Sequence, residues 1–167
     1  MSKKRSLTAI DFDFGVGAII PATQEAYHNN ELNEQIRKTE KGDLIQFKNT
    51  LSLDLDSKLQ NNEYFPSDGE IFVFIIQYFA SDKEYGRRDV DNMAKTILDV
   101  LKKRFYSDDS QVKTLLVGKK LEKRVPQNFA YVAIKKLSAS QDVDALKISG
   151  LERSVIMFQE LKSKKVL

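Results

Sequence analysis

The stretch Ile71-Phe72-Val73-Phe74-Ile75-Ile76-Gln77-Tyr78-Phe79 contains, apart from Gln77, only β-branched and aromatic residues. Both of its alternating faces are apolar, and a run of this kind predicts a central strand that is covered on both sides. The turn residues Phe65-Pro66-Ser67-Asp68-Gly69 precede it, and a charged loop over residues 81–88 follows it. We therefore place this strand at the centre of a sheet.

Two segments with helical periodicity flank the strand. The first follows Asp43, which is placed to cap a helix, and repeats large apolar residues every three or four positions until Asn61 and Asn62. The second carries an apolar stripe of Met93, Ile97 and Leu101. Its polar face carries Asp91, Lys95 and Asp99.

The remaining segments complete an α+β fold with a small mixed β-sheet of about four strands, two packed helices and an additional C-terminal helix. Strands are predicted over residues 10–16, 111–117 and 129–137, with a basic hairpin over 118–128 and a long polar loop over 23–41. Residues 1–137 form one domain and residues 138–167 a helical extension.

The composition narrows the function classes. The chain has 167 residues, no cysteine and a single histidine, His28, so disulfides, thiolate chemistry and a histidine-based zinc site are not expected. No run of about 18 apolar residues predicts a membrane span, and we expect a cytoplasmic protein. The net charge is only +3, but twelve basic and eight acidic residues lie between positions 81 and 124. Any metal would be held by oxygen ligands.

An Asp-x-Asp pair alone is a weak sign of a metal site in this chain, because four are present. Three have simple structural explanations. Asp11/Asp13 lie on the wet face of a strand, Asp54 of Asp54/Asp56 can pair with Lys58 at i,i+4, and Asp142/Asp144 fall near a helix start.

The fourth pair, Asp89/Asp91, lies where the central strand leads through a charged loop into the second helix. Sites gather in crevices beyond strand ends. A structural explanation is equally open: an N-terminal cap with Arg87 or Arg88 as counter-ion, and Lys95 as an i,i+4 partner of Asp91. Spacing alone does not decide between them.

The sequence Arg87-Arg88-Asp89-Val90-Asp91-Asn92-Met93-Ala94-Lys95, followed by Asp99 and by Asp108-Asp109-Ser110-Gln111-Val112, resembles the RusA family of Holliday junction resolvases. It matches the family's R-R-D-x-D-N-x-x-K and D-D-x-Q-V elements. These are endonucleases common in phages and prophages, so residues 1–137 are expected to be an endonuclease domain. The tail after Leu137 is an addition to the family pattern.

The resemblance implies that Asp89, Asp91 and Asp109 bind Mg²⁺, or Mn²⁺, that water attacks a phosphodiester there, and that Lys95 supplies a further positive charge. Asp109 is expected to return beside the other two, and Asp108 is the ambiguous member of its pair. A homodimer acting on branched DNA, a four-way junction, is implied as well. The alternatives are a catalytically silent protein that binds branched or single-stranded DNA, and a nuclease for flaps or forks. The residues predicted to contact DNA are Arg87, Arg88, Asn92, Lys102, Lys103, Lys119, Lys120, Lys123 and Arg124.

Overall fold

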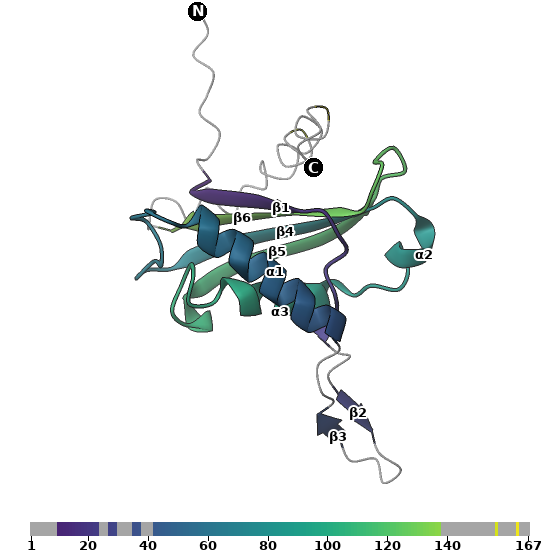
Figure 1. The fold of residues 1–167 in the computed structure, drawn as a ribbon, viewed down its shortest axis with the longest axis horizontal. Coiled ribbons are helices and arrows are strands. Elements are labelled where there is room, and N and C mark those ends of the chain that lie inside the picture. The colour runs from purple at the N-terminus through teal and green to yellow at the C-terminus, as the bar shows by residue number, and fades with distance from the viewer. Residues whose placement is uncertain are drawn as a thin grey trace, which may run out of the picture.

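The computed structural model describes residues 10–23, 27–29, 35–37 and 42–137, together with the single positions Ile156 and Ser163. The predicted α+β fold with a small mixed sheet is confirmed (Figure 1). The C-terminal helix and the Asp142/Asp144 pair fall in the part of the chain that is not described. The elements are β1 (Phe12–Val16), β2 (Tyr27–Asn29), β3 (Gln35–Arg37), α1 (Gly42–Lys58), β4 (Ile71–Phe79), α2 (Asp82–Tyr85), α3 (Val90–Leu101), the 3-10 turn Asp109–Gln111, β5 (Val112–Leu121) and β6 (Phe129–Lys136).

The main sheet has the strand order β1-β6-β4-β5. β6 is antiparallel to both of its neighbours, whereas β5 is parallel to β4. β4 is buried at every position except Phe72, which confirms the prediction of a central strand. Because β4 and β5 are parallel, α3 forms the crossover that carries the chain from one end of the sheet back to the other.

The predicted hairpin over residues 118–128 is wrong. β5 and β6 do not pair with each other, because β4 lies between them. β6 is buried at seven of its eight positions, which requires a place inside the sheet. β5 is only half-buried and exposes Leu115, which suits an edge strand. The connection therefore crosses over β4.

The polar segment 23–41, predicted as a loop, contains the short antiparallel pair of β2 and β3. Such a pair is joined by backbone hydrogen bonds, so it leaves little alternation of apolar residues in the sequence. α1 begins two residues earlier than predicted, at Gly42, so Asp43 lies in the first turn instead of capping the helix. Asn61 adopts a positive φ of 64° just after α1, which confirms the predicted helix end.

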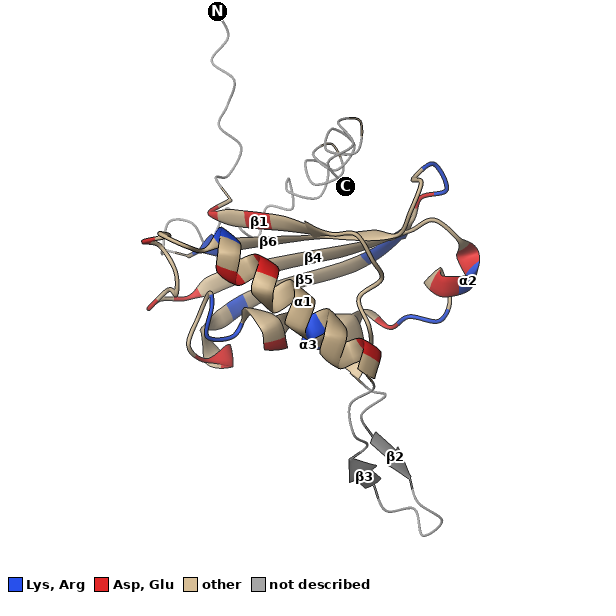
Figure 2. Ribbon diagram, viewed as in Figure 1, with Lys and Arg blue, Asp and Glu red and all other residues tan. Residues whose placement is uncertain are grey.

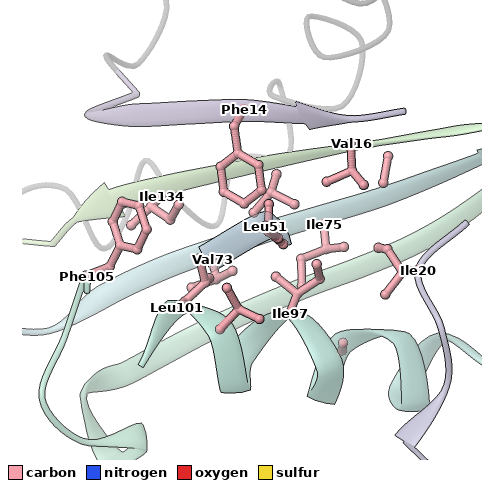
Figure 3. Packing of buried hydrophobic residues seen from close by; sticks show 14 of the residues in the cluster. Phe14, Val16, Ile20, Leu51, Val73, Ile75, Ile97, Leu101, Phe105 and Ile134 are labelled. Atoms are coloured by element: carbon pink, nitrogen blue, oxygen red, sulfur yellow. The ribbon is translucent and has the colours of Figure 1, made fainter. Parts of the chain in front are cut away.

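The core lies between one face of the sheet and the two long helices. Figure 3 shows Leu51 of α1 and Ile97 of α3 packed against the β4 side chains Val73 and Ile75. A second buried cluster occupies the opposite face, where the rings of Tyr78 and Phe129 stack with centroids 4.6 Å apart. Burial on both faces fixes the position of β4, and therefore the point at which the following loop begins.

The segment after β1 is tied to β4 and α3. The backbone N–H of Ile20 donates to Oε1 of Gln77 at 2.9 Å, and the hydroxyl of Thr96 donates to the carbonyl of Pro21 at 2.6 Å. The segment after β1 therefore joins the end of β4 to the middle of α3. None of the helices in the described ranges has the length and apolar character that crossing a membrane requires.

Candidate functional site

The Asp89/Asp91 pair lies at the start of α3, beyond the end of β4. The chain leaves β4 at Phe79, forms α2, and reaches Asp89 in an extended conformation (φ −95°, ψ 133°) immediately before the helix. Asp91 and Lys95 follow in the first two turns, and all three side chains are exposed. The apolar stripe of α3 faces the core, so the polar face that carries Asp91 and Lys95 points to solvent.

These three side chains make no stabilising contact with another side chain in the described part of the chain. Asp89 occupies the N-cap position, but its carboxylate makes no capping hydrogen bond. Arg88 pairs with Glu84 instead, at 3.3 Å. Within the described ranges, no ion pair or side-chain hydrogen bond involves Asp89, Asp91 or Lys95. The structural explanation of this pair, a cap with an arginine counter-ion, is not what the structure has.

The other Asp-x-Asp pairs in the described chain behave differently. Asp11 accepts a hydrogen bond from the backbone N–H of Lys136 at 2.6 Å, and Asp13 accepts one from the hydroxyl of Tyr131 at 2.8 Å. The predicted pair of Asp54 with Lys58 is confirmed at 2.8 Å. In the same helix, the two carboxylate oxygens of Asp56 accept from the guanidinium of Arg104 at 2.7 and 3.1 Å.

Asp109 lies at the opposite end of α3. Its Oδ2 is 3.1 Å from Nζ of Lys102, the residue that ends the helix. The following strand, β5, starts beside the first residue of β4, whereas Asp89 comes after the last residue of β4. A helix of twelve residues rises about 18 Å, so Asp109 and Asp91 are separated by the length of α3.

The expectation that Asp109 returns beside Asp89 and Asp91 is therefore wrong for a single chain. In the described ranges no three acidic or histidine side chains lie close enough to hold one metal ion. The physical reason is the parallel direction of β5. A residue that follows a crossover helix and precedes a parallel strand must lie at the end of the sheet where the previous strand began.

The roles of Asp108 and Gln111 in the second motif are structural. Asp108 caps the 3-10 turn, accepting from the backbone N–H of Ser110 at 3.1 Å and from its hydroxyl at 2.5 Å, and these bonds lower the pKa of Asp108. Gln111 accepts from the backbone N–H of Asp108 and donates to the carbonyls of Ser67 and Gly69. Asp109 is left exposed, with Lys102 beside it, and the hydrogen bond from Lys102 to Asp109 is the main reason that the pKa of Lys102 is raised.

Basic residues gather at the end of the sheet where β4 ends. Figure 2 shows them on the final part of β5, on the connection to β6 and on the segment after α2. Some of them are already paired, Lys123 with Asp82 at 3.0 Å and Arg124 with Glu122 at 2.9 Å. Lys102, at the other end of α3, pairs with Asp109. Of the predicted DNA contacts, Arg87, Lys103 and Lys120 are exposed and make no ion pair with a described side chain.

Two predicted DNA contacts have different surroundings. Asn92 is buried, with 7% of its surface exposed, and its backbone carbonyl accepts hydrogen bonds from Thr23 and Thr96. Lys119 is half-buried and donates to the backbone carbonyls of Tyr85 and Arg88. Sequence reasoning missed the contact of Lys119 with the segment before Asp89, because backbone carbonyls leave no signal in the sequence.

Comparison with known proteins assigns the chain to a family. The family model described as Endodeoxyribonuclease RusA matches residues 17–135, about seven tenths of the chain. The match begins directly after β1, ends inside β6, and includes Asp89, Asp91, Lys95 and Asp109. A search of the curated proteins gives no match. The chain belongs to the RusA family of endodeoxyribonucleases.

Proposed function

We propose that the protein cuts four-way DNA junctions as a homodimer, in a reaction that depends on Mg²⁺. The observation that carries the proposal is that Asp89, Asp91 and Lys95, at the start of α3, make no ion pair with a described side chain, whereas the other described Asp-x-Asp pairs are engaged in the fold. Two exposed carboxylates that pair with no described side chain are suited to bind a cation, and an exposed ammonium beside them is suited to bind a phosphate.

The donor set fits a divalent cation. Mg²⁺ is bound by oxygen atoms, commonly by one or two carboxylates together with water and substrate phosphate. Asp89 and Asp91 supply two carboxylates at one place, and neither must break an ion pair with a described residue to do so. A cation held there supplies Lewis-acid stabilisation of the charge that develops on the cleaved phosphodiester. Lys95, one helical turn after Asp91, adds a positive charge on the same face of α3.

A role for Asp109 requires a second copy of the chain. Asp109 lies at the far end of α3, so we propose that it serves the site of its partner. In a two-fold symmetric contact that places the two α3 helices antiparallel, the end of each helix faces the start of the other. One such contact would supply Asp109 to both sites, and it would join two active sites in one dimer, as the cutting of two strands requires.

The test of the activity uses labelled DNA. A four-way junction, a flap and a linear duplex are incubated with the protein in Mg²⁺, Ca²⁺ or EDTA. We expect cleavage of the four-way junction in Mg²⁺ only, and binding without cleavage in Ca²⁺. Asp91→Asn should abolish cleavage and retain junction binding, while the matched control Asp54→Asn should cleave normally. Preferential cutting of the flap would show that flaps, and not four-way junctions, are the substrate. Binding without cutting in every condition would favour a catalytically silent DNA-binding protein.

The test of the shared site mixes two inactive variants. In a heterodimer of Asp91→Asn with Asp109→Asn, a site built from both chains retains one intact copy, since Asp91 comes from one subunit and Asp109 from the other. Mixing and exchanging the subunits should then restore cleavage of one strand. If each site were built within one chain, both sites of the heterodimer would be broken and the mixture would stay inactive. A monomeric mass at micromolar concentration would also overturn this part of the proposal.

A further inference from the structure

The side chain of Lys119 reaches from β5 to the segment that precedes Asp89. Its Nζ donates to the backbone carbonyl of Tyr85 and to that of Arg88, both at 2.8 Å. It also lies 4.6 Å from the centre of the Tyr85 ring. One ammonium thus contacts both ends of the short segment that joins α2 to α3.

The position of Lys119 is itself fixed by the sheet. Lys119 is paired with Gln77 in the register of β4 and β5, and Gln77 is fully buried at the centre of the sheet. The ring of Tyr85 packs edge-on against Phe79 at 5.8 Å, so the near end of the segment is anchored in the core as well. At the far end the Asp89 carboxylate does not cap α3, and the neighbouring Val90 packs against the core.

The carbonyl of Arg88 belongs to the peptide bond that joins it to Asp89. A hydrogen bond to that carbonyl orients the peptide plane and therefore the direction in which the Asp89 side chain leaves the backbone. We infer that Lys119 is a positioning residue for the active site: its ammonium holds the segment 85–89 so that Asp89 and Asp91 present their carboxylates together. The inference rests on the proposed nuclease function.

This role differs from the contact with a DNA phosphate that the position of Lys119 in a basic segment suggests. An ammonium has three donors, and two of them are occupied by carbonyls within the protein. A phosphate contact depends on the positive charge. A clamp on two carbonyls depends chiefly on the hydrogen-bond donors, so the two roles respond differently to an uncharged donor.

The test compares Lys119→Met, which removes both charge and donors, with Lys119→Gln, which keeps amide donors but no charge. We expect kcat for junction cleavage to fall about tenfold to a hundredfold in Lys119→Met, and by less in Lys119→Gln, with KM within about twofold of wild type in both. The salt dependence of junction binding, measured in Ca²⁺, should be unchanged. Lys113→Met is the control on the same strand, because Lys113 pairs with Glu70 at the other end of β5, and it should change none of these quantities.

The opposite pattern would overturn the inference. A lysine that holds a phosphate would raise KM equally in both variants and would reduce the slope of log K against log salt by about 1 when it is lost. Amide hydrogen exchange of residues 85–89 provides a measure that is independent of catalysis. Faster exchange there in Lys119→Met, with the rest of the sheet unchanged, is expected even if wild type proves to cut no DNA, whereas unchanged exchange would refute the clamp itself.

Discussion

Nζ of Lys102 lies 3.1 Å from Oδ2 of Asp109, and the pair closes the C-terminal end of α3. Asp108 caps the 3-10 turn, so Asp109 is the acidic residue of its motif that the proposed function assigns to the metal site. The same lysine lies 3.6 Å from Asp108, so its charge is shared between the two carboxylates. A cation that binds Asp109 must compete with this ammonium.

Lys102→Met should therefore lower the Mg²⁺ concentration that gives half-maximal cleavage, because Asp109 no longer has a competing positive charge beside it. The ion pair is solvent-accessible, so its removal should change the free energy of unfolding only slightly. A titration of junction cleavage against Mg²⁺ measures the effect. Lys103→Met is the control, since Lys103 is the next residue and makes no ion pair with a described side chain. A Mg²⁺ requirement that rises in Lys102→Met would show that Lys102 assists Asp109 instead of blocking it.

Asp91→Asn should remove the stabilisation of the folded protein by Mg²⁺. A ligand that binds only the folded state increases the free energy of unfolding, by about 2.7 kcal/mol at a hundredfold excess over Kd, and so raises the thermal midpoint. Thermal unfolding of wild type, Asp91→Asn and Asp54→Asn, each with and without Mg²⁺, measures this. The increase should persist in Asp54→Asn, whose carboxylate is used by Lys58. An equal increase in all three proteins would place the cation elsewhere.

The strongest patterns in the sequence predicted the parts of the fold that are decided by burial. β4 is apolar on both faces and lies inside the sheet, and the stripe of Met93, Ile97 and Leu101 is completely buried. The apolar content of a segment predicts how deeply it is buried, but it does not predict which strands pair with it. β5 and β6 follow each other in the chain, so a hairpin was the simplest expectation, although the stronger burial of β6 puts it between β1 and β4.

The candidate site could be predicted only in part, because the sequence predicts local spacing but not which distant segments meet. The spacing of Asp91 and Lys95 within one helix places both on one exposed face. The placement of Asp109 depends on whether β5 runs parallel or antiparallel to β4, and no pattern in the sequence predicts this direction. The contact of Lys119 with the carbonyls of Tyr85 and Arg88 depends on the register of two strands and on the path of a loop. Contacts of side chains with backbone atoms are set by tertiary structure and leave no motif.

Gln77→Leu should lower the free energy of unfolding by about 2–4 kcal/mol, because it leaves buried backbone groups without hydrogen-bond partners. Oε1 of Gln77 accepts from the N–H of Ile20, and Nε2 donates to the carbonyls of Ala18 and Phe129 at 3.2 and 2.9 Å. Urea unfolding measures the loss. Gln60→Leu, at an exposed position, should change stability by less than about 0.5 kcal/mol. Equal stabilities of the two variants would mean that the groups around residue 77 find other partners.

Glu122→Gln should change how stability depends on pH. The guanidinium of Arg124 donates to Glu122 at 2.9 Å and, chiefly through this bond, lowers the pKa of Glu122 from 4.5 to about 2. The folded carboxylate then stays charged in a pH range where the unfolded one takes up a proton. The pair stabilises the fold fully above the unfolded pKa, and this contribution is lost as pH falls through the folded pKa.

The thermal midpoint of wild type should therefore exceed that of Glu122→Gln by a constant amount above about pH 5.5, and the difference should shrink between about pH 4.5 and pH 2. Circular dichroism melts at a series of pH values measure it. Glu63→Gln serves as the control for the loss of an exposed carboxylate, because Glu63 makes no ion pair with a described residue. A Glu122→Gln difference that grows on acidification would mean that the carboxylate is held in its protonated form in the folded chain.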